Sequence, residues 1–115
     1  MVICQQWAAR VLVVTWICGV LLGSAVCASA DEAGKKVYQR DCQSCHGPDG
    51  TGNPQLAKVL QVAIPPVTGA ALKQKDDVEL LRLLAEGKGK MPGFAKKLAA
   101  EEQRQVLEYM RTLGQ

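Results

Sequence analysis

The sequence predicts a small all-α domain, and the first observation behind this prediction is the spacing of its apolar residues. Two segments place apolar side chains three and four residues apart, which is the spacing of one helix face. The first set is Val78, Leu81 and Leu84, and the second is Val106, Leu107, Met110 and Leu113. The second observation is that no segment shows the clear apolar–polar alternation of a half-buried strand. We therefore expect three to four helices, joined by segments rich in Gly and Pro.

The helical segments follow from these patterns in chain order. They are expected at residues 32–45, at 55–61 as a short turn, between Asp76 and Gly87, and at about 101–113. Turn-forming residues fill 47–54 and end the first helix. Residues 64–67 are expected to be extended, because the ring of proline excludes a helix.

The ends of the two later helices carry different signals. Asp76 followed by Glu79 resembles an N-terminal capping box, with Asp in place of the usual Ser or Thr. The cap position of the last helix is Ala99 or Ala100, and neither offers a side-chain acceptor, which costs about 1 kcal/mol.

Size and charge exclude several classes of protein. The chain has 115 residues, which is one domain at most. Its residues are 48% hydrophobic and 22% charged, an ordinary globular composition that disfavours intrinsic disorder. The net charge of +3 is too small and too dispersed for a nucleic-acid binder. The chain has one His, so an enzyme that needs two is excluded.

Residues 1–30 have the composition of a secretory signal peptide. A single charge, Arg10, precedes the mostly apolar run from Val11 to Val26, and an Ala-Ser-Ala site ends at Ala30. We expect cleavage after Ala30, which leaves a domain of residues 31–115 in the periplasm. The alternative is an uncleaved membrane anchor, and only then would the protein contact a membrane. The 16-residue apolar run is short of the ~20 residues that span a bilayer.

Cys42-Gln43-Ser44-Cys45-His46 is the C-x-x-C-H attachment pattern of c-type haem. On a helix these three side chains share a face, so Cys42 and Cys45 can form thioethers to two vinyl groups while His46 faces the iron. A structural disulfide, a thioredoxin-like redox pair and a zinc site are the alternatives. The export signal and the few aromatic residues left for a core favour one covalent haem c.

Two methionines of the expected mature chain could supply a second axial ligand. Met110 lies in an apolar helical stripe, so packing in the core is its expected role. Met91 lies among Gly and Pro residues that favour a loop, and a loop can present the thioether to iron. We predict that Met91 is the ligand; the alternative is that it packs on the haem edge.

The chain resembles the small monohaem class I cytochromes c of bacteria, which have His and Met as axial ligands. The resemblance covers nearly all of residues 31–115 and rests on the motif, the Met91-Pro92 loop and the order of helices. It implies a cytochrome c fold, with the helices wrapped around one covalently bound haem. It also implies a close crossing of the first and last helices, marked by Gly34 with Tyr38 and by Val106 with Tyr109. In the family a proline carbonyl accepts a hydrogen bond from the proximal His, and Pro65 or Pro66 could do so here.

These observations predict a one-electron carrier rather than an enzyme. An iron with both axial positions filled does not bind a small-molecule substrate readily, and its coordination changes little between ferric and ferrous states. Redox proteins are the expected partners, and an acidic partner surface would dock on a basic cluster of Lys88, Lys90, Lys96 and Lys97. The alternatives are a subunit of a larger oxidoreductase complex, or a haem enzyme or gas sensor if Met91 is labile.

Overall fold

A computed structural model describes residues 28–115 of the chain. The described residues form six helices: α2 (Ala28–Asp41), α3 (Gln43–His46), α4 (Pro54–Leu60), α5 (Gly69–Leu72), α6 (Asp77–Glu86) and α7 (Ala100–Thr112). Over this part of the chain there is no strand, and Lys88 and Met91 form an isolated antiparallel bridge. No helix within residues 28–115 has the length and apolar character needed to cross a bilayer.

The predicted signal peptide lies almost wholly outside the described residues. Only 28–30 are described, and their backbone belongs to helix α2. The helix therefore begins before the predicted cleavage point after Ala30.

The all-α prediction is confirmed, with local differences. The first predicted helix is divided at Cys42 into α2 and α3, although the chain stays helical enough for the His46 N–H to donate to the Cys42 carbonyl at 3.0 Å. Helix α5 was not predicted. Its N-cap is Thr68, whose hydroxyl accepts from the Ala71 N–H at 3.3 Å, and its four residues are too few to show a periodic pattern.

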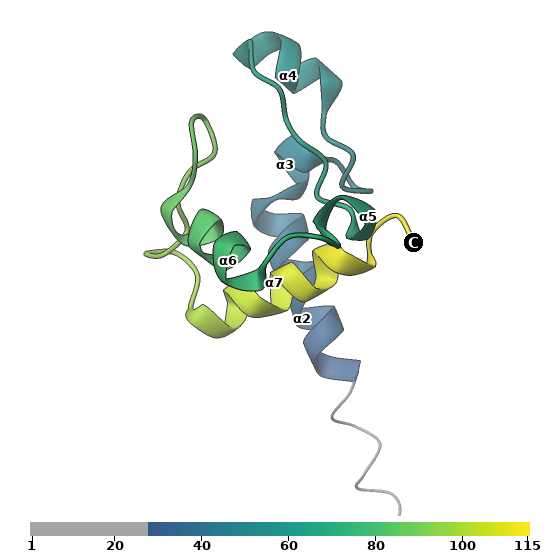
Figure 1. The fold of residues 1–115 in the computed structure, drawn as a ribbon, viewed down its shortest axis with the longest axis vertical. Helices are drawn as coiled ribbons and strands as arrows, with labels where there is room; N and C mark the ends of the chain where they lie inside the picture. The colour runs from purple at the N-terminus through teal and green to yellow at the C-terminus, as the bar shows by residue number, and fades with distance from the viewer. Residues whose placement is uncertain (1–27) are drawn as a thin grey trace, which may run out of the picture.

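Helices α2 and α7 cross closely in the lower half of the molecule (Figure 1). A side chain at Gly34 has no room, because its Cβ would lie 2.2 Å from the Gln105 carbonyl oxygen. The rings of Tyr38 and Tyr109 meet beside the crossing with their centres 5.5 Å apart, and Val106 is fully buried. The close crossing implied by the resemblance is therefore present.

We expect Gly34→Ala to destabilise the domain by about 3 kcal/mol. The new methyl group would overlap backbone atoms of α7, which can move only if the two helices separate. Chemical denaturation followed by helical circular dichroism measures the effect. Lys35→Ala is the matched control, because Lys35 is exposed on the same helix. Equal stability of the two variants would contradict the assigned crossing.

The buried face of α6 differs from the predicted one. Leu84 is buried as predicted and Leu81 is partly buried, but Val78 is 73% exposed. Leu80, at 8% exposure, takes the buried position instead. The helix has four leucines within five positions, so a face rotated by one or two residues fits the sequence equally well. Packing against α7 selects the face in the folded protein.

The helix starts agree with the sequence in part. Asp76 caps α6 by accepting from the Val78 N–H at 2.9 Å, but the Glu79 side chain does not return a bond, so the capping box is incomplete. Ala99 caps α7 and offers no side-chain acceptor, as predicted. Glu102 returns from the first turn to accept from the Ala99 N–H at 2.9 Å, which satisfies one donor at that end.

Arg111 holds the C-terminal end of α7 to the segment between α5 and α6. Its guanidinium donates to the carbonyls of Leu72 at 2.9 Å and Lys75 at 3.2 Å, and it pairs with Asp77. Gly69 lies so close to α7 that a Cβ there would be 2.1 Å from the Arg111 carbonyl oxygen. Helices α5, α6 and α7 therefore form one connected wall.

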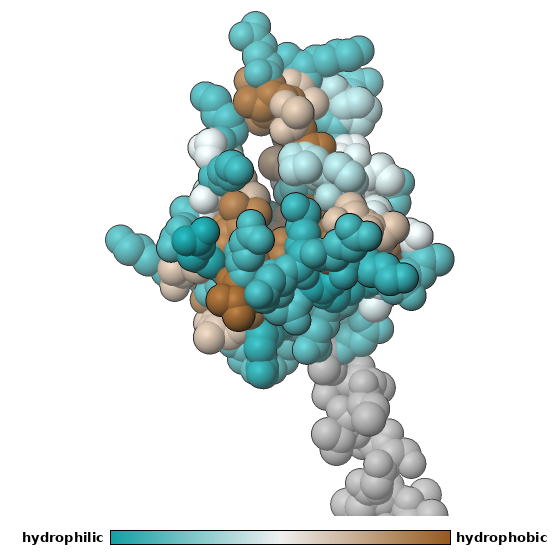
Figure 2. All heavy atoms as spheres, viewed as in Figure 1, coloured by the Kyte–Doolittle hydropathy of each residue, from teal (hydrophilic) through white to brown (hydrophobic). Residues whose placement is uncertain are grey.

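Helix α4 projects from the rest of the molecule (Figure 1). Asn53 caps it by accepting from the N–H groups of Gln55 and Leu56, each at 3.1 Å. Its apolar residues are poorly covered: Val59 is 78% and Leu60 37% exposed. Figure 2 shows apolar side chains gathered on this projection. The protein's own side chains thus leave part of its apolar surface unburied.

Candidate haem site

The Cys42–His46 motif is held by the loop that follows it. The N–H of Gly52 donates to the His46 carbonyl at 2.7 Å, and the N–H of Asn53 donates to the Cys45 carbonyl at 2.9 Å. The Asn53 side chain also donates to the Ser44 carbonyl at 3.2 Å. These bonds satisfy the last carbonyls of α3, so the short helix is stabilised by its loop rather than by its length.

The two cysteines of the motif do not form a disulfide with each other. Cys42 is buried, and burial, followed by the nearby charge of Asp41, raises the pKa of its thiol to about 11. Cys45 is partly exposed. The structure therefore favours a neutral thiol at Cys42, which can add across a carbon–carbon double bond.

His46 presents a partly buried ring to the interior. Burial lowers the pKa of the imidazole, and the backbone carbonyl of Pro65 opposes this effect. The Nδ1 atom is buried and forms no hydrogen bond within the described residues. Of the two prolines that the sequence left open, Pro65 is the one whose carbonyl acts on this ring.

Tyr38 connects α2 to the end of the motif. Its hydroxyl donates to the Gly47 carbonyl at 2.6 Å, and the side chain is fully buried. Burial raises the pKa of Tyr38 to about 12, with smaller contributions from Cys42, Tyr109 and Asp49. This bond fixes the position of the turn that follows His46.

The raised pKa of Tyr38 predicts a loss of stability at alkaline pH. The unfolded chain releases the phenolic proton near pH 10, whereas the folded chain keeps it to about pH 12. The contribution of Tyr38 to the free energy of unfolding is therefore complete below pH 10. It falls by on the order of 2 kcal/mol as the pH rises to 12. Tyr38→Phe should remove this decline in denaturation curves, whereas Tyr109→Phe should retain it. An identical pH dependence in wild type and Tyr38→Phe would contradict the assignment.

Met91 lies in a tight hairpin that is fixed to the end of α6. Lys88 and Met91 exchange two backbone hydrogen bonds of 3.0 Å, and the Phe94 N–H donates to the Leu84 carbonyl at 2.9 Å. Gly87 has φ +76°, and a Cβ there would lie 2.5 Å from the Met91 carbonyl oxygen. Backbone packing therefore fixes the position of the Met91 backbone at the end of α6.

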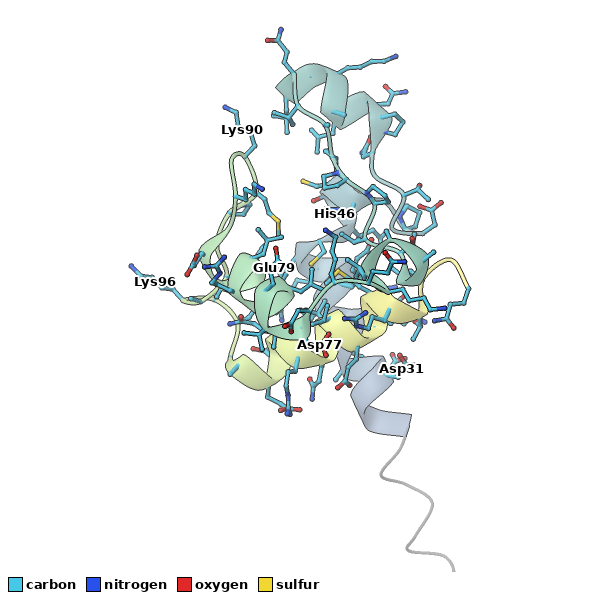
Figure 3. All side chains as sticks on the ribbon, in the orientation of Figure 1. Asp31, His46, Asp77, Glu79, Lys90 and Lys96 are labelled. Carbon is cyan, nitrogen blue, oxygen red and sulfur yellow. The ribbon has the colours of Figure 1, made fainter. Side chains whose placement is uncertain are left out.

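Two adjoining cavities bring the predicted site residues together. One has a volume of about 490 Å³ and the other about 480 Å³, and both are lined by Cys42, His46 and Met91. Cys45 lines the second cavity. Figure 3 shows His46 in the interior, between the α6 side and the projecting α4. The motif and the Met91 hairpin thus border one interior space.

This space fits a haem by the chemistry of its donors. Two cysteine side chains line this space, and a partly buried imidazole and a thioether also line it, as covalent attachment and His/Met ligation of iron require. The remaining wall is mostly apolar, and it includes Leu60 of α4 and, from the segment that follows α4, Val62 and Ile64. A bound porphyrin would cover side chains that the protein alone leaves exposed.

Met110 has a different environment from Met91. It is 5% exposed, belongs to the apolar core and lines only the first cavity. Its position on α7 agrees with its predicted packing role.

The predicted basic cluster is divided by the fold. Lys88, Lys90, Lys96 and Lys97 are all exposed. Lys88 and Lys90 line the second cavity, and Lys90 and Lys96 extend outward in Figure 3. Lys97 instead pairs with Asp41, with Nζ 2.5 Å from Oδ1. The sequence indicated only Glu86 as a nearby acid, because Asp41 is distant along the chain.

Comparison with known proteins assigns the chain to a family. The family model of cytochrome c oxidase, cbb3-type, subunit III matches residues 29–110. The curated cbb3-type cytochrome c oxidase subunit CcoP of Azospirillum brasilense is 36% identical over 89 residues, which are 76% of this chain and 30% of that protein. The chain thus spans less than a third of that relative's length.

A solved structure has the same fold. Cytochrome c6 of the diatom Phaeodactylum tricornutum matches with a TM-score of 0.54 and 24% sequence identity, over 70% of this chain and 90% of that one. The helical fold and the family together define a small class I cytochrome c, an electron carrier with covalently bound haem c. The chain belongs to the family of cbb3-type cytochrome c oxidase subunit III. The predictions of fold, family and cofactor are confirmed.

Proposed function

We propose that Cys42 and Cys45 hold the haem through thioethers and that His46 and Met91 are its axial ligands. The observation that carries this proposal is that Cys42, His46 and Met91 line both cavities. Each thioether forms when a thiol adds across a vinyl group, with sulfur bonding to carbon and the thiol hydrogen going to the neighbouring carbon. This addition needs no oxidant.

The surrounding residues keep the two ligands in place. A ligating histidine donates its other ring N–H to a nearby acceptor. We propose the Pro65 carbonyl for this role, because burial lowers the pKa of the imidazole and this carbonyl raises it, although Nδ1 forms no hydrogen bond within the described residues. The hairpin bonds at Lys88 and Phe94 limit the movement of Met91. Filled axial positions favour rapid one-electron exchange and disfavour substrate binding.

The proposed setting is the periplasm, where the domain exchanges electrons with other redox proteins. Residues 1–30 have the composition of an export signal with cleavage after Ala30. Thioether attachment retains the cofactor outside the cytoplasm. Intact mass spectrometry of the chain matured in a periplasm tests both points. We expect a chain that begins at Asp31 and carries one haem. A chain without haem would contradict the attachment, and one that begins at Met1 would contradict the cleavage.

A role as a subunit of a larger complex is the second candidate. The family match and the CcoP relative favour it, because both are named as parts of a cbb3-type oxidase. Affinity purification from membrane and soluble fractions separates the two settings. Recovery with oxidase subunits supports a complex, whereas recovery of the free domain supports a diffusing carrier.

We propose that Lys88, Lys90 and Lys96 steer an acidic partner surface toward the Met91 side of the domain. Lys88 and Lys90 line the cavity, so a partner that binds them approaches the cofactor. The rate of electron exchange should fall several-fold as ionic strength rises, and Lys90→Gln should lower the rate at low salt. Lys35→Gln on α2 is the matched control. A rate that is independent of salt would contradict this mode of docking.

A further inference from the structure

Asp41 is a buried acid at the edge of the proposed haem space. It is the last residue of α2 and directly precedes Cys42. Its side chain is 0% exposed, and it lines the second cavity together with His46 and Met91. A carboxylate in this position is unusual, because acids are rarely buried unless they are paired.

Two cations contact the carboxylate from different segments. Arg40 Nε lies 2.8 Å from Oδ2, and Lys97 Nζ lies 2.5 Å from Oδ1. Burial raises the pKa of Asp41, but the bonds from Lys97 and Arg40 lower it by more, so the pKa lies below its usual value. Asp41 is therefore negatively charged at neutral pH.

The Asp41–Lys97 pair joins the two parts of the chain that carry the proposed ligands. Asp41 adjoins the motif, whereas Lys97 lies in the turn after the Met91 hairpin, where its N–H donates to the Phe94 carbonyl at 2.9 Å. Lys97 remains 60% exposed, so its charge is partly solvated while that of Asp41 is not. The two charges therefore act unequally on the cavity.

We infer that Asp41 is a positioning residue of the electron-transfer reaction. Its negative charge lowers the reduction potential of the haem, and the positive charge of Lys97 opposes this effect. A buried negative charge beside the cavity stabilises the ferric state relative to the ferrous state, because the ferric centre carries one more positive charge. Water and salt screen a buried charge only weakly. The inference rests on the proposed attachment at Cys42, which places the haem beside this carboxylate.

The test is the midpoint potential of the haem-loaded protein, measured by optical redox titration. Asp41→Asn should raise the potential, with about a tenfold change in the electron-exchange equilibrium constant, or 59 mV for one electron. Lys97→Gln should lower it. In the Asp41→Asn background the effect of Lys97→Gln should shrink, because the lysine is no longer held beside the cavity. Asp31→Asn and Lys36→Gln make the same charge changes at exposed sites of α2 and should leave the potential unchanged.

A purely structural role gives a different pattern. If the ion pair only tightened the fold, both single variants would shift the potential in the same direction. That result, or potentials equal to wild type in both, would overturn the inference. If Asp41→Asn does not acquire haem, the Lys97→Gln variant alone tests the inference. An unchanged reduction potential in Lys97→Gln then refutes it. The optical spectrum is recorded first, so a wild-type protein without covalent haem would refute the proposed attachment separately.

Discussion

Replacing both Cys42 and Cys45 by alanine should leave the matured chain largely unfolded. The variant would lose its covalent haem, and the two cavities would lose the group that we place in them. A domain of this size has only about 5–15 kcal/mol of stability, and uncovered apolar residues such as Val59 add nothing to it. We expect low helical circular dichroism at 25 °C and no cooperative thermal transition.

The matched control for this experiment is Ser44→Ala. Ser44 lies between the two cysteines and is exposed, so the change preserves both thiols and the backbone of α3. The control should carry haem and melt like wild type. A cooperative, native-like transition in the double cysteine variant would show that the polypeptide core is sufficient without the cofactor.

Replacing Met91 by alanine should open one axial position of the iron. The ferrous protein should then bind carbon monoxide rapidly, and the methionine–iron charge-transfer band of the ferric protein should disappear. The reduction potential should fall by on the order of 0.1 V, because a thioether ligand favours the ferrous state. The hairpin backbone bonds between Lys88 and Met91 do not involve the side chain, so the loop should remain.

Met110→Leu is the control for the second methionine. Met110 is buried in the core, and leucine preserves its volume, so stability should fall by less than about 1.5 kcal/mol. The charge-transfer band should persist in this variant. If the band persisted in Met91→Ala and vanished in Met110→Leu, the ligand assignment would be reversed.

The sequence predicts the helices where local chemistry decides them. Asp76 marks the start of α6 because a carboxylate can cap free N–H groups. The α2–α7 crossing at Gly34 is a long-range contact, and it was expected only from the resemblance to class I cytochromes c. The buried face of α6 was not predictable in this way. Leu80 and Val78 exchange roles because the contact with α7, rather than any property of the helix itself, selects the face.

The proposed site shows the same division between local and long-range information. The motif and the Met91 loop are visible in the sequence, since each has its own spacing or loop signal. The choice of Pro65 over Pro66 and the pairing of Asp41 with Lys97 arise only when distant segments meet. No local pattern encodes such contacts. The role that we assign to Asp41 in setting the reduction potential was therefore not predicted from the sequence.

The most direct test of the central claim is an optical spectrum of the matured protein, recorded oxidised, reduced, and reduced with carbon monoxide. We expect a low-spin c-type spectrum with a methionine–iron charge-transfer band in the oxidised protein and no response to carbon monoxide. That result would establish a closed site with His46 and Met91 as ligands. A high-spin spectrum that shifts with carbon monoxide would contradict it, because an open iron site is suited to catalysis or gas sensing.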